Sequence, residues 1–219
     1  MFKLSKVIDE RSLGVVTRTL DSCDWQDGRL TAGWQARQVK RNEQISSDDP
    51  QLQSLRKIVT EALLQHPAFV MAARPKALVP PRFSRYTAGM TYGDHIDDPV
   101  ILGYRTDLSL TLFLSDPDAY EGGELVIETA SGTEAVKLPA GDAVLYPSTA
   151  IHRVDPVRSG MRLASTTWVR SLIRDTAERE ILLDLDMARQ ALIQQNGSSR
   201  ELDLISKSVA NLIRRWADD

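Results

Sequence analysis

Apolar positions between Asp49 and His66 follow the alternating three- and four-residue spacing of an amphipathic helix. Asp49 can cap the start of this helix with Pro50 in its first turn, and Pro67 prevents it from continuing past His66. The pattern therefore predicts one helix with clear boundaries over residues 49–66.

Beyond about Phe83 the pattern changes to short apolar or alternating runs, which are typical of β-strands. The predicted strands cover residues 83–87, 107–115, 124–128, 135–138, 143–146, 152–157 and 161–171. Turn-forming residues separate them, including Gly122-Gly123, Ser131-Gly132, Pro139-Ala140-Gly141-Asp142 and Ser159-Gly160. Seven short strands with regular turns predict a β-sandwich or barrel.

After Arg174 the helical period returns. Asp175 and Glu178 form a capping box for a helix to about Gln195, and Asn196-Gly197 ends it. Ser198 and Glu201 repeat the box for a second helix, whose apolar stripe consists of Leu202, Ile205, Val209, Leu212 and Trp216.

This predicted helical hairpin divides the chain into a β domain with an N-terminal helix, residues 1–174, and a C-terminal extension, residues 175–219. Two roles for the extension stay open. It stabilises the protein by packing on the sheet, or its apolar stripe forms a homodimer, because an exposed stripe of this kind needs a partner.

Composition narrows the class of protein. The chain has 219 residues, with 27 Lys+Arg against 30 Asp+Glu and a formal net charge of −3. The balanced charge, without a dense basic run, argues against nucleic-acid binding. Cys23 is the single cysteine, so an intrachain disulfide or a Cys-rich zinc site is excluded. No window is apolar enough for a signal peptide or a membrane span, which predicts a cytoplasmic protein without membrane contact.

Two of the three histidines point to a metal site. His95 and Asp97 are two residues apart, so both face the same side of an extended segment. His152 is the other histidine on a predicted strand, and several strands and turns lie between it and His95. Two histidines and one carboxylate with open positions form the ligand set of non-haem Fe(II) oxygen chemistry.

Arg162 points to a cosubstrate in addition to the metal. It lies ten residues after His152, across the Ser159-Gly160 turn and at the start of the next strand. A planar guanidinium is suited to binding the far carboxylate of a dicarboxylate cosubstrate through paired hydrogen bonds.

These residues give the chain a family resemblance. His95-Ile96-Asp97, His152 and Arg162 resemble the HxD…H…R signature of Fe(II)- and 2-oxoglutarate-dependent dioxygenases, whose fold is a double-stranded β-helix or jelly roll. The Tyr86–Asp97 stretch and Tyr120-Glu-Gly-Gly-Glu-Leu125 are similar to the prolyl-4-hydroxylase-like branch. The region around Trp34, the Gly-Met-x-Tyr-Gly run and the helical tail resemble bacterial PKHD-type hydroxylases.

The resemblance implies a role for each matching residue. His95, Asp97 and His152 would bind the catalytic iron, Arg162 would bind the distal carboxylate of 2-oxoglutarate, and Tyr86 would line the cosubstrate pocket. It also implies Fe(2+), 2-oxoglutarate, O2 and, as a family expectation, L-ascorbate (vitamin C). Asp98-Pro99 departs from the small Asn-Ala-like pair of many relatives, and we expect this difference to alter the loop that shapes substrate entry but not the iron site itself.

Neighbouring charged residues compete with these assignments. Asp94 and Asp98 flank the motif, but strand alternation turns both away from the face of His95. Arg153 and Arg158 are rival carboxylate anchors, although Arg153 faces the other side of its strand and Arg158 belongs to a turn. His66, at a helix end, is assigned a structural role.

The sequence separates core packing from substrate contact less clearly for the aromatic residues. Trp168 is an even number of residues from Arg162 and so lies on the same face of the predicted strand. It either lines the floor of the pocket or belongs to the core, which is the commoner role of a buried strand tryptophan. Tyr92 and Tyr104 are assigned equally to core packing and substrate contact. For Trp25 and Trp34 we expect packing against the barrel in preference to an aromatic rim around the substrate.

The sequence thus predicts a mainly β jelly roll with flanking helices and a C-terminal hairpin, acting as a 2-oxoglutarate-dependent hydroxylase. The alternatives are a non-catalytic metal-binding jelly-roll sensor and a zinc hydrolase, neither of which needs Arg162. The substrate is a small molecule or a peptidyl group. The family's association with bacterial iron uptake makes a siderophore-like molecule the first hypothesis, with a link to iron homeostasis.

Overall fold

Two β-sheets face one another in the computed structural model, which describes residues 1–218 apart from the side chain of Asn196. The larger sheet has the strand order β1 (Phe2–Leu4), β14 (Ala143–Pro147), β10 (Leu108–Phe113), β17 (Arg162–Ser171), β6 (Arg82–Tyr86), β4 (Glu43–Ile45) and β2 (Trp25–Asp27), and β5 (Pro75–Leu78) also pairs with β17. All of its pairs are antiparallel.

The smaller sheet has the order β13 (Gly132–Val136), β12 (Leu125–Thr129), β15 (His152–Val154), β7 (Thr91–His95) and β3 (Lys40–Arg41). Two two-stranded sheets complete the β structure: β11 (Tyr120–Gly122) with β16 (Val157–Gly160), and β8 (Val100–Ile101) with β9 (Tyr104–Arg105). The predicted mainly β jelly roll with flanking helices is confirmed.

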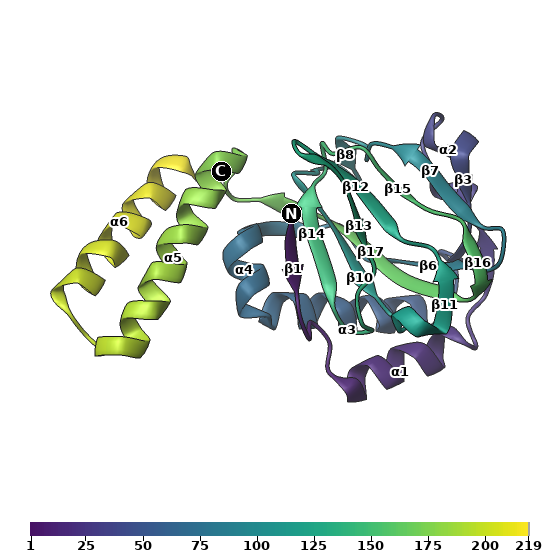
Figure 1. The fold of residues 1–219 in the computed structure, drawn as a ribbon, viewed down its shortest axis with the longest axis horizontal. Helices are drawn as coiled ribbons and strands as arrows, with labels where there is room; N and C mark the ends of the chain where they lie inside the picture. The colour runs from purple at the N-terminus through teal and green to yellow at the C-terminus, as the bar shows by residue number, and fades with distance from the viewer. Residues whose placement is uncertain (219) are drawn as a thin grey trace.

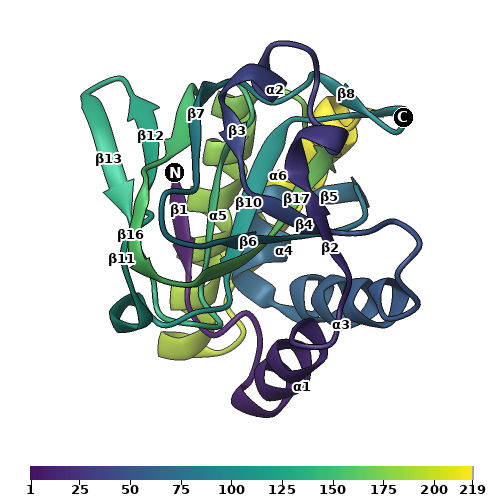
Figure 2. The same cartoon turned by 90° about the vertical axis from the view of Figure 1, so that its right-hand side faces the viewer.

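Helices cover the outer face of the larger sheet. They are α1 (Glu10–Leu20), α3 (Leu52–Gln65) and α4 (Pro67–Ala73), whereas the short α2 (Ala36–Val39) lies beside β3 and β7 (Figure 2). Short 3-10 turns occupy Gly28–Thr31 and Pro117–Ala119. Apolar residues of the three helices pack on outward-facing leucines of β10, such as Leu110 and Leu112, and this contact forms the main core.

Alternation along β17 separates the two faces of the larger sheet. Leu163 and Val169 face the helices, whereas Arg162, Ala164 and Trp168 line the space between the sheets. A second core fills the closed end of that space with residues such as Phe113, Ile127 and Val144. The inward face of β17 therefore carries polar residues that an ordinary core strand would not have.

The predicted strands agree with the structure except in detail. The run 152–157 is divided at Asp155-Pro156 into β15 and β16, because proline cannot donate a ladder hydrogen bond. The predicted strand 135–138 corresponds to β13, which begins and ends earlier in the chain, at Gly132–Val136. Pro67 ends α3, as predicted, but it also begins α4 at the first helical position, where proline is well tolerated. The predicted cap at Asp49 is wrong: α3 begins at Leu52 with Gln51 at its N-cap, and Asp49 instead accepts from the backbone N–H groups of Gln51 and Asp24 in the preceding turn.

The C-terminal residues form α5 (Thr176–Asn196) and α6 (Arg200–Trp216), a helical hairpin that stands to one side of the sandwich beyond α4 (Figure 1). Asp175 caps α5 as predicted, but Ser199, not Ser198, caps α6 by accepting from Leu202 N–H. The α6 stripe packs against Ile173 and Leu182, and α5 contacts α4, so the hairpin joins the domain through a helix instead of lying on a sheet.

The last described residue ties this hairpin to the β domain. The Arg105 guanidinium binds Asp218 at 2.5 Å and Asp107 at 2.7 Å, and the Ile173–Ala217 bridge lies beside them. None of the helices in residues 1–218 combines the length and apolar character needed to cross a bilayer.

Candidate metal centre and cosubstrate pocket

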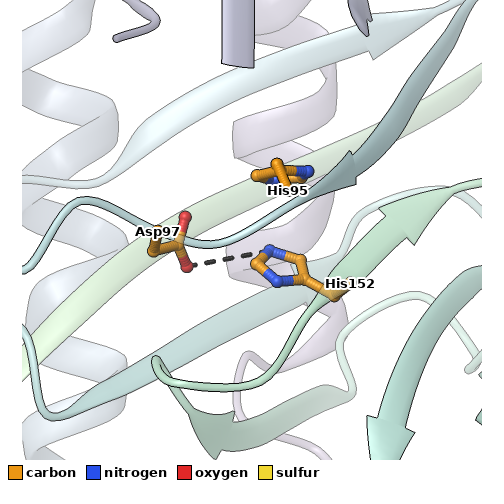
Figure 3. Close-up of side chains that lie close together, drawn as sticks. All are labelled: His95, Asp97 and His152. Atoms are coloured by element: carbon orange, nitrogen blue, oxygen red, sulfur yellow. Dashed lines mark ion pairs between the residues drawn. The ribbon is translucent and has the colours of Figure 1, made fainter. Parts of the chain in front are cut away.

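His95, Asp97 and His152 lie together between the two sheets (Figure 3). One ligand atom from each lies within 4.8 Å of the other two, and Asp97 Oδ2 is 3.7 Å from His152 Nε2. Ligands about 2.1 Å from one metal ion are separated by no more than about 4.2 Å, so small side-chain movements bring all three onto one ion. The residues fit a two-histidine, one-carboxylate centre.

Strand pairing explains how two distant histidines meet. β7 and β15 are neighbours, and His95 is directly opposite His152 in their register. The register shifts between His152 and Val154, where Val154 pairs with Tyr92. This irregularity turns both Tyr92 and His95 inward, and their rings stack with centroids 3.6 Å apart.

Backbone carbonyl groups orient both imidazole rings. His95 Nδ1 is 2.8 Å from the Gly93 oxygen, and His152 Nδ1 is 3.1 Å from the Ala150 oxygen. Because a carbonyl oxygen can only accept, each Nδ1 donates and each Nε2 keeps a free lone pair for a metal. Burial, together with the nearby His152, lowers the pKa of His95 to about 4, so this ring is neutral near pH 7.

Ser109 holds the Asp97 carboxylate, and Ser148 contacts Ser109 in turn. Ser109 Oγ donates to Asp97 Oδ2 at 2.6 Å and lies 2.8 Å from Ser148 Oγ. Ser109 projects inward from β10, and both serines are buried. Neither serine is predicted from the sequence, although polar positions that alternate with the leucines of β10 are a usable signal.

Arg162 lies in the same pocket as the three predicted ligands and is 2% exposed. Its Nε has no hydrogen-bond partner within residues 1–218, and its guanidinium lies 5.1 Å from the Tyr86 ring and 5.5 Å from the Phe113 ring. Tyr86 is opposite Arg162 in the β6–β17 register. A buried guanidinium without an acidic partner is costly unless a ligand supplies the negative charge.

The rival groups lie elsewhere. Arg153 forms ion pairs with Asp155 at 2.7 Å and Asp94 at 3.5 Å, outside the pocket, and Arg158 is exposed on β16. Asp94 therefore points away from His95, as expected, whereas Asp98 is exposed at the pocket margin. His66 accepts from Phe69 N–H and lies 3.1 Å from the Ser5 carbonyl oxygen, which agrees with its predicted structural role.

The aromatic residues divide into three groups. Trp168 and Tyr92 line the pocket, and Trp168 also packs on Val79 and Ile101. Tyr104 is exposed on β9. Trp25 packs against the core as expected, but the prediction for Trp34 is wrong: it is 79% exposed, in the turn that precedes α2.

Comparison with known proteins places this geometry in a family. The model of the 2OG-Fe(II) oxygenase superfamily matches residues 81–170, and that of the PKHD-type hydroxylase C-terminal domain matches residues 176–218. A PKHD-type hydroxylase of Picosynechococcus sp. is 48% identical over 217 residues, 99% of each chain. One from Acaryochloris marina is 46% identical over 98% of each chain. The chain belongs to the PKHD-type hydroxylases.

Solved structures support the fold independently. A prolyl hydroxylase from Trichoplax adhaerens, solved with a hypoxia-inducible-factor peptide fragment, superposes with a TM-score of 0.58 at 15% identity and covers 82% of this chain and 86% of its own. A Pseudomonas putida prolyl-4-hydroxylase gives a TM-score of 0.55 at 19% identity, with 78% and 91% covered. The chain is thus an oxygenase whose family uses Fe(2+) and 2-oxoglutarate.

Proposed function

We propose that this PKHD-type hydroxylase binds Fe(II) through His95, Asp97 and His152 and binds 2-oxoglutarate through Arg162 and Tyr86. The observation that carries the proposal is the position of Arg162, a buried cation that has no acidic partner among residues 1–218, in the pocket that holds the His-Asp-His group. A metal site without a cosubstrate has no use for such a residue.

Each residue has a definite task in this scheme. The Nε2 lone pairs and Asp97 would hold the iron, and the Arg162 fork would fix one carboxylate of 2-oxoglutarate. With O2, iron and 2-oxoglutarate supply the oxidation that releases succinate and CO2 and hydroxylates the substrate. Burial raises the pKa values of Tyr86 and Tyr146, so both phenols stay protonated and can donate to a bound anion. Leu125 and Val154 keep that part of the pocket apolar.

Succinate formation tests the function. Aerobic incubation of the purified protein with Fe(II) and 2-oxoglutarate should yield succinate, and Zn(II) should suppress it. The variants His95→Ala, Asp97→Ala and His152→Ala should each fold but fail to retain Fe(II) in metal analysis. Tight 2-oxoglutarate binding without succinate would instead indicate the non-catalytic sensor, and near wild-type iron in a ligand variant would remove that residue from the site.

Three finer parts of the proposal concern the substrate, the requirement for ascorbate and the location in the cell. We propose a siderophore-like or other small-molecule substrate linked to iron homeostasis, a requirement for L-ascorbate, and action in the cytoplasm. Metabolite profiling of a deletion strain under iron limitation tests the first part. Succinate yield over repeated turnovers, with and without ascorbate, tests the second, and cell fractionation tests the third.

The boundary after Arg174 and the role of the tail are also proposals. The hairpin's α6 stripe is covered by α5, which favours a stabilising extension over a homodimer formed by that stripe. Light scattering with size-exclusion chromatography should therefore show a monomer. A dimer that dissociates when residues after Arg174 are removed would support the homodimer instead.

A further inference from the structure

Two cations line the pocket on the side nearer its margin, away from Arg162. Lys40 comes from β3 and Arg82 from β6, and both belong to the lining that includes His95, Asp97 and Arg162. In the β6–β17 register Arg82 is opposite Thr166, four residues along the strand from Arg162. At about 3.3 Å per residue, the two arginines lie about 13 Å apart along the sheet.

Lys40 is buried, with 4% of its surface exposed. Its Nζ donates one hydrogen bond, to Thr31 Oγ1 at 3.2 Å, and lies 5.1 Å from the centroid of the Tyr92 ring. An ammonium group has three donors, so two are not used by these contacts. Burial, and to a smaller extent the nearby Arg82, lowers the pKa of Lys40 to about 7, and the more distant Asp97 and Asp27 only partly oppose this shift.

Arg82 is in a similar position. Its Nη1 donates to the Thr31 carbonyl oxygen at 3.3 Å, and its Cζ lies 5.0 Å from the Trp168 ring. Trp168 Nε1 is buried and has no hydrogen-bond partner within the described residues. Lys40, Arg82 and Trp168 thus form a group of N–H donors whose capacity exceeds the acceptors around them.

No carboxylate in residues 1–218 lies within 4.0 Å of either cation. The charges of the proposed site do not compensate them either. An iron(II) ion, Asp97, a 2-oxoglutarate dianion and Arg162 together carry no net charge, which leaves the charge of Arg82, and that of Lys40 whenever it is protonated, unbalanced. Asp98 is exposed at the pocket margin, so solvent screens its effect.

We propose that the substrate of this hydroxylase is a carboxylate, whose anionic group binds Lys40, Arg82 and Trp168 while another part of the molecule lies against the iron-binding residues. This inference rests on the proposed function and narrows its substrate class. The Arg82 fork matches a carboxylate in geometry, and Lys40 adds a point charge. Binding of the anion also satisfies the free Trp168 N–H.

Matched ligand pairs test the inference by calorimetry under anaerobic conditions. The full-length protein, loaded with Fe(II) and 2-oxoglutarate, is titrated with small carboxylates and with their primary amides, for example N-acetylproline, N-acetylglycine and benzoate. We expect at least one carboxylate to bind ten times more tightly than its amide. Lys40→Met and Arg82→Gln should each reduce that preference about tenfold, with 2-oxoglutarate affinity unchanged.

Arg41→Gln is the matched control, because Arg41 follows Lys40 in β3 but is exposed. It should keep the carboxylate preference. The inference is overturned if no carboxylate is preferred over its amide, or if the preference survives in both variants. Inorganic phosphate binding better than every carboxylate would likewise overturn it in favour of a phosphorylated substrate. Failure of the proposed function appears separately, as absent 2-oxoglutarate binding and absent succinate in the wild type.

Discussion

Two backbone carbonyl groups decide which nitrogen each histidine would present to the proposed iron. The oxygens of Gly93 and Ala150 hold the Nδ1 atoms of His95 and His152, and both acceptors lie two residues before the ring that they orient. The local chain therefore fixes each tautomer without another side chain. The carboxylate is different, because Asp97 depends on Ser109 from a separate strand.

Ser109→Ala is the sharpest test of that dependence. Removing the 2.6 Å hydrogen bond leaves Asp97 free to rotate, and we expect Fe(II) affinity to fall about tenfold while the melting temperature changes little. A competition titration with a fluorescent chelator measures the affinity. Ser165→Ala, a buried serine on the outward face of β17, is the control and should keep wild-type affinity.

Arg162→Lys separates charge from geometry. Lysine keeps the positive charge but cannot form the planar pair of hydrogen bonds, so 2-oxoglutarate binding should weaken by about 2–4 kcal/mol with Fe(II) affinity nearly unchanged. Calorimetry on anaerobic, Fe(II)-loaded protein gives both values. Arg153→Lys, on the outer face, should have no effect. An unchanged affinity in Arg162→Lys would mean that another residue holds the cosubstrate.

At the scale of elements, the Gly122-Gly123 turn makes room for Arg162. Gly123 has a φ of +66°, and a Cβ there would lie 3.1 Å from Arg162 Cδ and 2.9 Å from Val157 Cγ2. The turn after β11 thus controls the position of a side chain on β17. The close approach requires glycine for both its conformation and its size.

Gly123→Ala should therefore displace Arg162 and weaken 2-oxoglutarate binding about tenfold, on the scale of an overpacked core contact. Gly89→Ala is a strict control: φ is +84° there, but nothing lies within 4 Å of the added Cβ. Both variants carry backbone strain, so both should lose some stability. Equal 2-oxoglutarate affinities in the two variants would show that the spacing at Gly123 has no influence on the anchor.

The length and regularity of the strands explain why some elements could be predicted from the sequence and others could not. Strands β10, β14 and β17 have unbroken apolar or alternating runs, and glycine turns precede β14 and β17, so their pattern is clear. β7 reads Thr-Tyr-Gly-Asp-His, and its irregular pairing with β15 leaves no strict alternation. β2, β3 and β4 have only two or three residues each, too few for periodicity to appear.

Some residues of the candidate site could likewise be predicted from the sequence, and others could not. The HxD pair, His152 and Arg162 carry residue types that are scarce or chemically specific, so their spacing pointed to them. Lys40 is one lysine among many charged residues, and it reaches the pocket because β3 pairs with β7. Arg82 shares the parity of Tyr86, but the predicted strand began one residue after it, at Phe83. Long-range pairing, which the sequence does not display, places both residues.

For the whole molecule, burial of Lys40 links stability to pH. Its pKa in the folded protein is about 7, below the usual 10.5, so between these values the unfolded chain binds one more proton. Stability therefore rises with pH across that window, and the penalty is fully present below pH 7. The total penalty is on the order of 5 kcal/mol before relaxation reduces it.

Lys40→Met should accordingly raise the melting temperature of the metal-free protein, more at pH 6 than at pH 9. Thermal unfolding followed by circular dichroism measures the difference. Lys207→Met, an exposed position on α6, should show no such pH dependence. A Lys40→Met effect of equal size at both pH values would mean that the ammonium group is not destabilised in the folded protein.

Arg162 lies between the buried rings of Tyr86 and Phe113, whereas Lys40 and Arg82 both contact the half-buried Thr31, and this difference has a kinetic consequence. If the inner position holds 2-oxoglutarate and the outer one the substrate, addition follows a compulsory order, because an occupied outer position obstructs the inner one. Succinate then leaves after the hydroxylated product. Initial-rate measurements should show succinate competing with 2-oxoglutarate but not with substrate, and high substrate concentrations should slow each turnover by trapping succinate behind a newly bound molecule.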